Sequence, residues 1–218
     1  MKQIIYNLKK QINTNYITII FLFIISFILY GCENYDERIL KNGDIIFHES
    51  LSSQSKVIKS VTGSKYTHVG IIFIQNNKTY VLEAVQPVRI TPINEFIDRG
   101  VKKHFVIKRV KSSKAFLTNE MLDKMYGIGK SFPGKDYDIF FKWDDSQIYC
   151  SELVWKIYKR GAGLEIGNLE KFKDYDLSSS EAKFLIKQRY GSQFNPEELI
   201  ITLSHMFESD KLETVYQN

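Results

Sequence analysis

Three residues far apart in the sequence have side chains that together could perform nucleophilic catalysis: His68, Glu83 and Cys150. An imidazole beside a thiol favours the thiolate, which is a strong nucleophile. A carboxylate on the other side of the imidazole fixes its orientation and stabilises its protonated form. The chemistry expected from such a set is attack on the carbonyl carbon of an amide or an ester.

The first two of these residues lie in a predicted β-hairpin. Residues 66–74 and 79–85 are rich in β-branched and aromatic side chains, and Asn76-Asn77 between them is a turn signal. If the turn has two residues, the residue numbers of each facing pair add up to 153. This register can be tested directly, because a slip by one residue would move every side chain to the other face of the sheet.

The predicted register brings the imidazole and the carboxylate together. It places Gly70 directly opposite Glu83 and His68 one diagonal step away, with all three on one face of the sheet. Gly70 has no side chain, so Glu83 has room to lean toward His68. The alternative is a half-buried strand histidine with an unrelated glutamate nearby.

The thiol is predicted at the start of a helix over residues 150–160. Cys150, Leu153, Val154 and Ile157 fall on one face of this helix, which indicates that the thiol points toward the core. The positive end of the helix dipole favours a thiolate at this position. The alternative is a small apolar side chain that fills space between helix and sheet.

The N-terminal region is typical of an exported lipoprotein. A basic stretch is followed by an apolar run over residues 16–30, which is shorter than the roughly 20 residues of a spanning helix. The run ends in Leu29-Tyr30-Gly31-Cys32, which resembles a bacterial lipobox and implies lipidation of Cys32, although a small residue is usual where Tyr30 stands. The alternative is an uncleaved membrane anchor; both place the domain outside the cytoplasm, tethered to a membrane, with an outer membrane or periplasmic location expected.

Charge and cysteine content narrow the possible functions. The net charge is +5, and the first 31 residues carry +3 of it, so the rest carries only +2 and gives no sign of nucleic-acid binding. The chain has two cysteines; if Cys32 is lipidated, Cys150 has no disulfide partner. A metal hydrolase is a poor alternative, because no His-Glu-x-x-His or paired Cys-x-x-Cys motif is present, and no cofactor is expected.

Four short segments together resemble the permuted NlpC/P60 (papain-like) cysteine hydrolases, in particular the YiiX/YaeF-like branch, which includes lipoproteins. The resemblance covers about residues 40–165. Its segments are Gly43-Asp44-Ile45-Ile46, Lys65-Tyr66-Thr67-His68-Val69-Gly70-Ile71, Leu82-Glu83-Ala84 and Tyr149-Cys150-Ser151-Glu152-Leu153-Val154.

The resemblance implies a role for each matching residue. Cys150 matches the nucleophile, His68 the base and Glu83 the third polar residue, in the permuted order His, Glu, Cys. Tyr137 matches a weaker part of the pattern and would line the site or help to hold the oxyanion. The implied fold is α+β, a small antiparallel sheet or barrel packed against a few helices.

The expected organisation is a signal peptide over 1–31, a tether over 32–42, a catalytic domain over 43–208 and a frayed tail over 209–218. Further elements predicted from the pattern are a strand over 104–110 and helices over 93–99, 118–130 and 197–206.

The expected function is hydrolysis of an amide or ester in a cell-wall peptide or a lipid-linked amide. A lipid acyltransferase of the same fold is an alternative, and a non-catalytic lipoprotein that binds wall or lipid is another. The aromatic residues around Phe132 and over 140–143 would either line an acyl-chain groove or belong to the core. The sequence does not determine the oligomeric state.

Overall fold

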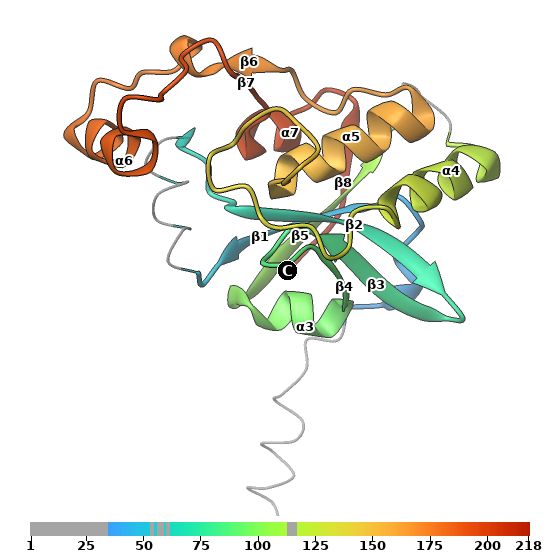
Figure 1. Ribbon diagram of the computed structural model, residues 1–218. Helices are drawn as coiled ribbons and strands as arrows, with labels where there is room; N and C mark the ends of the chain where they lie inside the picture. The colour runs from blue at the N-terminus through green and yellow to red at the C-terminus, as the bar shows by residue number, and fades with distance from the viewer. Residues whose placement is uncertain (1–34, 53–54, 56–58, 60–61, 113–116) are drawn as a thin grey trace, which may run out of the picture. The chain divides into compact units, whose positions relative to one another are not determined.

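A six-stranded antiparallel sheet in the order β4-β3-β2-β1-β5-β8 forms the centre of the fold (Figure 1). A separate two-stranded sheet pairs β6 with β7. The strands are β1 (Ile45–Ser50), β2 (His68–Gln75), β3 (Lys78–Glu83), β4 (Arg89–Pro92), β5 (Gly100–Val110), β6 (Glu170–Lys171), β7 (Leu199–Ile200) and β8 (Leu212–Gln217).

The computed structural model describes residues 35–218 except 53–54, 56–58, 60–61 and 113–116. Residues Glu37–Asn218 form one compact unit. The predicted signal peptide over 1–31 lies outside the described residues, as does the first part of the tether, which begins with Cys32.

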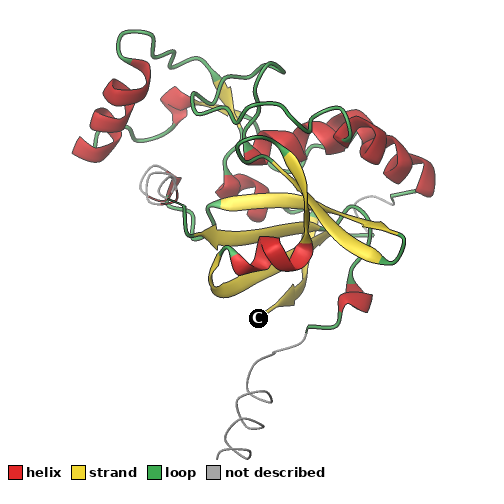
Figure 2. Cartoon of the chain, turned by 60° about the horizontal axis from the view of Figure 1, so that its bottom comes forward, coloured by secondary structure: helices red, strands yellow, loops and turns green. Residues whose placement is uncertain are grey.

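Helices cover the main sheet on two sides. Figure 2 shows the short α3 against the strands on one side, and α5 with α4 lies over the other. The helices are α3 (Ile93–Asp98), α4 (Asn119–Gly129), α5 (Cys150–Ala162), α6 (Ser180–Tyr190) and α7 (Leu203–Phe207), with 3-10 turns at Glu37–Ile39 and Phe172–Asp174. The predicted α+β class, a small antiparallel sheet packed against a few helices, is confirmed.

The hairpin of β2 and β3 has the register that its turn predicts. Gly70 faces Glu83, and the pairs continue to Gln75 opposite Lys78. Asn76 and Asn77 both have positive φ angles, 49° and 58°, as a two-residue turn of the type that matches strand twist requires.

The core lies between the sheet and α5. Alternate residues of the strands, such as Phe47, Val69 and Ile71, are fully buried there, and they share one cluster with Leu153 and Ile157 of the helix. The helix ends at Gly163, whose φ of 70° is the left-handed conformation common after a helix. Burial of this face fixes the rotation of the helix about its axis, and Cys150 belongs to the same buried cluster.

Two predictions for the C-terminal region are wrong. Residues 197–206 are not one helix. β7 pairs with β6, and α7 begins only at Leu203, where the side chain of Thr202 caps its N-terminus. The tail is not frayed, because β8 pairs with β5, and the side chain of Asn218 accepts a hydrogen bond from the backbone N–H of Phe105 at 2.8 Å. Backbone pairing with distant strands decides both cases, and local sequence patterns do not report it.

Candidate active site

Cys150 is the first residue of α5, and its side chain is buried. As the first helical residue, it has a backbone N–H without a partner inside the helix, at the positive end of the helix dipole. Tyr149 and Ser151 on either side hold this end in place. The hydroxyl of Tyr149 accepts a hydrogen bond from the N–H of Ile201 at 3.1 Å, and the hydroxyl of Ser151 donates to the carbonyl of Ile201 at 2.7 Å.

His68, at the start of β2, contacts Glu83, at the end of β3. The Nε2 atom of His68 lies 2.6 Å from Oε2 of Glu83, and both side chains are buried. A Cβ atom on Gly70 would come within 2.3 Å of Val81 and 3.4 Å of the Glu83 side chain. The absence of a side chain at Gly70 therefore lets the two strands bring the histidine and glutamate together.

The second oxygen of Glu83 is held by residues that follow it in the chain. Thr91 on β4 donates a hydrogen bond to Oε1 at 2.5 Å, Arg99 donates to the same atom, and Arg89 lies 3.9 Å away. Burial opposes ionisation of Glu83, but the hydrogen bond with His68 and the charges of His68 and Arg99 outweigh burial and lower the pKa to about 2. Glu83 is therefore an ionised carboxylate with fixed geometry at neutral pH.

The imidazole of His68 also interacts with the thiol of Cys150. Burial alone would lower the pKa of His68, but the hydrogen bonds and charges of Cys150 and Glu83 raise it to about 9. The imidazole is therefore positively charged at neutral pH. An imidazolium between a carboxylate and a thiol is the arrangement that stabilises a thiolate nucleophile.

A second histidine, His48 on β1, packs against the first. Its ring lies 5.3 Å from the ring of His68 and stacks on Phe96 of α3 at 4.3 Å, measured between centroids. Burial, together with the charges of His68 and Arg99, lowers the pKa of His48 to about 2, so this ring is neutral. It contributes a flat, uncharged surface that limits movement of the His68 ring.

Tyr137 comes from the loop that precedes α5 and reaches the same thiol. It forms an isolated parallel bridge with Ile148, two residues before Cys150, and its side chain interacts with the Cys150 thiol. Burial, followed by the charge and hydrogen bond of Cys150, raises the pKa of Tyr137 well above its usual value. Its hydroxyl is therefore a proton donor beside the nucleophile.

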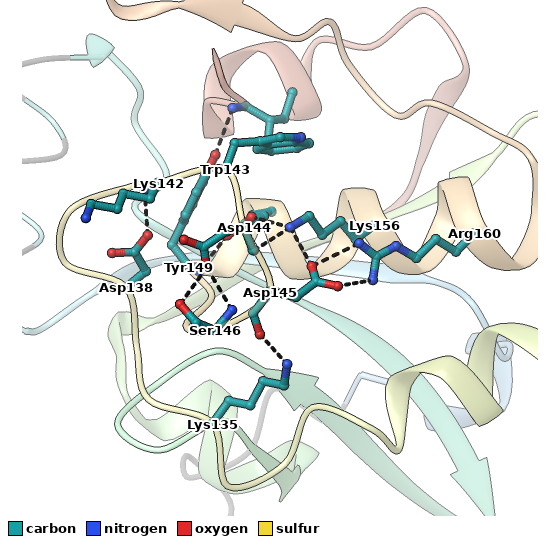
Figure 3. Close-up of polar contacts among 12 residues, drawn as sticks. Lys135, Asp138, Lys142, Trp143, Asp144, Asp145, Ser146, Tyr149, Lys156 and Arg160 are labelled. Atoms are coloured by element: carbon teal, nitrogen blue, oxygen red, sulfur yellow. Dashed lines mark hydrogen bonds and ion pairs between the residues drawn. The ribbon is translucent and has the colours of Figure 1, made fainter. Parts of the chain in front are cut away.

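The loop before α5 is fixed by charged side chains, as Figure 3 shows. Lys156 of the helix donates to the carbonyl oxygen of Asp144 at 2.6 Å and to the carboxylate of Asp145 at 2.7 Å, and Arg160 also binds Asp145. The buried carboxylate of Asp138 accepts from the N–H of Lys142 at 2.5 Å. These contacts fix the loop that carries Tyr137 against the helix that carries the thiol.

An apolar pocket of about 850 Å³, open solvent at its mouth included, lies on the Cys150 side of the site. Nearly all of its accessible wall is apolar. Its walls come from the loop before α5, from α6 and from the segment between β7 and α7. Its lining includes Tyr137, Cys150, Phe172, Leu185, Ile186 and Leu203.

A wider and more polar cleft lies on the His68 side. It measures about 1570 Å³ with its open solvent, and its lining includes Ser50, Thr67, His68, Gln86, Asp136 and Gln147. Gln86 donates to Asp136 at 2.6 Å and accepts from the backbone N–H of Tyr137 at 2.7 Å. Tyr137 lines both hollows and so stands at the boundary between them.

The structure therefore brings together the four residues that the sequence singled out, His68, Glu83, Tyr137 and Cys150, and their catalytic roles stay a prediction. Sequence reasoning assigned no place in the site to Thr91 or Arg99, and it expected a surface or strand-end role for His48, which is buried within β1. The signal for Thr91 and Arg99 would have been the pairing of β3 with β4, in which Glu83 faces Arg89. This pairing brings β4 and the following helix toward Glu83.

The aromatic residues that were expected either to line an acyl-chain groove or to belong to the core do both. Phe132 is buried in the core, and Trp143 packs against Trp155 at 5.3 Å between ring centroids. Phe141 lines the apolar pocket, whereas Phe140 lines the polar cleft. Among the residues that the structure describes, no helix is both long and apolar enough to cross a membrane.

Comparisons with known proteins give a consistent result. The family described as permuted papain-like amidase enzymes, YaeF/YiiX, C92 family, matches residues 39–216. The uncharacterized protein YiiX of Escherichia coli (strain K12) is 41% identical over 175 residues, which are 80% of this chain and 85% of that protein. A crystal structure of the metalloprotein YiiX from Escherichia coli O157:H7 has a TM-score of 0.77 and 39% identity, and the match covers 82% of this chain and 97% of that chain.

The description of that relative as a metalloprotein raises the question of whether the present site fits a metal ion. The donor set around Cys150 does not suit one, because both oxygens of Glu83 are occupied by His68, Thr91 and Arg99. Within the described part of the chain, no group of three or more His, Cys, Asp or Glu residues is placed to hold a metal. The roles of the residues around Cys150 as acid, base and nucleophile stay a prediction.

Proposed function

Because the chain belongs to the YaeF/YiiX family of permuted papain-like amidases, we propose that it cleaves amides through an acyl-enzyme on Cys150, with a long apolar acyl group as the preferred substrate portion. The single observation that carries the acyl preference is the apolar pocket that opens beside Cys150. Hydrolysis of an ester with the same acyl group would use the same groups.

In the first step, the thiolate of Cys150 attacks the carbonyl carbon, and a C–S bond forms. The negative charge that develops on the carbonyl oxygen is stabilised by the backbone N–H of Cys150, which has no partner inside the helix, with the hydroxyl of Tyr137 as the second donor. When the intermediate collapses, the C–N bond breaks, and the leaving amine takes the proton of the His68 imidazolium.

In the second step, the acyl group passes to water. His68, now neutral, accepts a proton from water as the C–O bond forms, and the C–S bond breaks to release the acid and the thiolate. Glu83 stabilises the imidazolium at the beginning and end of the cycle, because its carboxylate lies 2.6 Å from Nε2 of His68. Thr91 and Arg99 keep that carboxylate ionised and oriented.

The proposed substrate divides between the two hollows. The acyl chain lies in the apolar pocket, where burial of each methylene stabilises the complex by about 0.8 kcal/mol. The leaving amine lies in the polar cleft on the side of His68, which is the group that must protonate it. A cell-wall peptide would place polar groups against an apolar wall, so the pocket favours the lipid-linked amide.

We also propose export and lipid anchoring through Cys32, on the basis of the lipobox-like sequence alone. Such an anchor would keep the enzyme next to membrane lipids and the cell wall, where either substrate class occurs.

The proposed function is tested with a series of amides that share one fluorogenic amine and differ in acyl length. We expect kcat/KM to rise by about fourfold per methylene until the pocket is full, which corresponds to about 0.8 kcal/mol for each group. Rapid quenching followed by mass spectrometry should show the acyl group on Cys150. Cys150→Ala is the control and should show neither turnover nor adduct.

A result in which stem peptides are cleaved and acyl length has no influence would contradict the lipid-linked substrate but keep the cysteine mechanism. Absence of any adduct on Cys150 from both substrate classes would contradict the mechanism itself.

Acyl transfer is a second candidate, and the open polar cleft favours it. The cleft reaches His68 from solvent, so an amine or alcohol bound there would meet the acyl-enzyme at the position where water attacks. A transferase would yield a new amide or ester in place of the free acid when a polar acceptor is added, and product ratios measured against acceptor concentration separate the two activities.

A further inference from the structure

We propose that the face formed by Leu51, Ile139 and the outer side of α6 docks onto an anionic lipid surface, from which the apolar pocket receives its acyl chain. We call this the rim face, defined by Leu51, Ile139, Lys183, Phe184 and Lys187. The inference rests on the proposed function, because it explains how an acyl group that is insoluble in water reaches Cys150.

The first observation is where the exposed apolar side chains lie. Only four large hydrophobic residues are exposed in the described part of the chain, and three of them lie at the rim. Leu51 is 67% exposed and Ile139 is 41% exposed, and both line the polar cleft; Phe184, 65% exposed, lies on α6. Isolated exposed hydrophobic residues need no explanation, but two at one cleft and a third on the helix that walls the neighbouring pocket point to an interaction surface.

The second observation is the division of α6 into two faces. Ala182, Leu185 and Ile186 line the apolar pocket. With 3.6 residues per turn, Phe184 falls on the side of the helix away from Ala182 and Ile186. The helix is therefore a thin wall that has the pocket on one side and Phe184 on the other.

The third observation links α6 to the loop that carries Ile139. Arg189 donates to the carbonyl oxygen of Ile139 at 3.2 Å, and the hydroxyl of Tyr190 donates to the carbonyl of Phe140 at 2.7 Å. Figure 1 shows α6 and the end of β1, which precedes Leu51, toward the same side of the picture. The three apolar side chains can therefore belong to one face.

Charge identifies the occupant of this face as an anionic lipid surface. Lys183 and Lys187 are exposed; Lys187 lies one turn after Phe184, and Lys183 lies one turn before Lys187 on α6. The helix as a whole carries three basic residues and one acidic residue, a net charge of +2. A phenylalanine flanked by lysines matches the interface of a bilayer, where the ring enters the headgroup boundary and each cation gains about 1 kcal/mol near anionic lipid.

The test is fluorescence quenching in the full-length chain bound to vesicles. Phe184→Trp places a reporter on the rim face, and Thr214→Trp places a matched reporter on an exposed position of edge strand β8. Each variant is mixed with phosphatidylcholine vesicles containing phosphatidylglycerol, with and without brominated acyl chains. The signal of Trp143 and Trp155, measured in the unsubstituted chain, is subtracted.

We expect brominated lipid to quench the tryptophan at position 184 and not the one at position 214. Lys183→Gln and Lys187→Gln in the Phe184→Trp chain should each lower the ratio of docked to undocked protein about fivefold. Lys78→Gln, at the β2–β3 turn, is the matched control and should leave this ratio unchanged. High salt should reduce quenching at position 184, because the lysine contribution is screened.

Equal quenching at positions 184 and 214, or none at 184, would overturn the docking proposal. The same samples are assayed with a short-chain amide that is soluble in water. Cleavage of this amide without quenching at 184 would leave the amidase standing and remove only the rim face. Quenching at 184 without cleavage of any amide would support the rim face and contradict the proposed chemistry.

Discussion

The apolar pocket and the polar cleft meet at Cys150 and His68 but are built in different ways. The pocket takes its walls mainly from the chain after residue 170, where side chains of α6 and of the segment before α7 supply apolar surface. The cleft is lined by the ends of β1 and β2 and by the loop around Asp136, and it is rich in hydrogen-bonding groups. This difference is the basis of the proposal that the two halves of the substrate bind in different hollows.

Each of the two proposed reacting groups belongs to one of the two hollows. Cys150 lines the pocket and His68 lines the cleft. The acyl group, which becomes bonded to sulfur, is therefore assigned to the apolar side, and the leaving group, which takes the proton from the imidazole, to the polar side. Substitutions that act on one hollow, on the other or on both can break this assignment.

The largest effect is expected from Cys150→Ala, which removes the proposed nucleophile on which cleavage of every substrate depends. We expect kcat/KM to fall at least about 10³-fold for every acyl length and every leaving group, because no acyl-enzyme can form. The measurement is steady-state turnover, with circular dichroism to show that the fold is kept. If turnover persists, the nucleophile lies elsewhere.

Glu83→Gln should give the next largest effect, and it tests the polar side. Loss of the carboxylate removes the charge that raises the pKa of His68, so kcat should fall by roughly 10²- to 10⁴-fold. In the parent enzyme, activity should decline as the pH rises through about 9, where the imidazolium loses its proton. In the variant, this decline should occur at lower pH.

The measurement for Glu83→Gln is a pH–rate profile of kcat/KM. Thr91→Val is a useful companion, because it removes one hydrogen bond to Glu83 but keeps the charge. An alkaline decline at the same pH in parent and Glu83→Gln would contradict the carboxylate–imidazolium pair.

Leu185→Trp should act on the apolar side alone. The larger side chain fills part of the pocket, so kcat/KM for long acyl chains should fall by roughly 10- to 200-fold, while short chains are cleaved as before. The measurement is the chain-length series used for the parent enzyme. An equal loss for short and long chains would mean that the acyl group does not lie beside α6.

Gln86→Leu should give the smallest effect, and on the polar side. Gln86 bridges Asp136 and the backbone of Tyr137. Each of these hydrogen bonds contributes about 0.5–1.5 kcal/mol to the stability of the folded protein. We expect a loss of up to about tenfold in kcat/KM that varies with the leaving amine and not with acyl length. A change in acyl-length preference would contradict the division between the two hollows.

Much of the polar half of the site could be predicted because its contacts are local in the chain. A two-residue turn fixes the pairing of β2 with β3, so Asn76 and Asn77 are enough to place His68 near Glu83. The roles of Thr91 and Arg99 were not predicted, since they depend on how β4 and α3 fold back toward Glu83.

The apolar half could not be predicted in the same way. Its walls come from segments whose packing partners are distant, such as Ile201, whose backbone binds the side chains of Tyr149 and Ser151. Helix α6 carries apolar side chains on its pocket face and Phe184 on its outer face, so it lacks the one-sided pattern by which helices are recognised.

The sequence by itself determined the chemistry that is available: a thiol at a helix start, an imidazole and a carboxylate in one hairpin register, and a motif set shared with permuted papain-like amidases. These features follow from periodicity and turn geometry, which act over a few residues. Only the tertiary structure decided that Cys150 meets His68, that Tyr137 stands between two hollows and that one of these hollows is apolar. Those facts depend on hydrogen bonds that join α5 and its preceding loop to the C-terminal region, between segments far apart in the chain. The Ser151–Ile201 and Phe140–Tyr190 bonds link residues 50 positions apart, and the Tyr149–Ile201 bond links residues 52 positions apart.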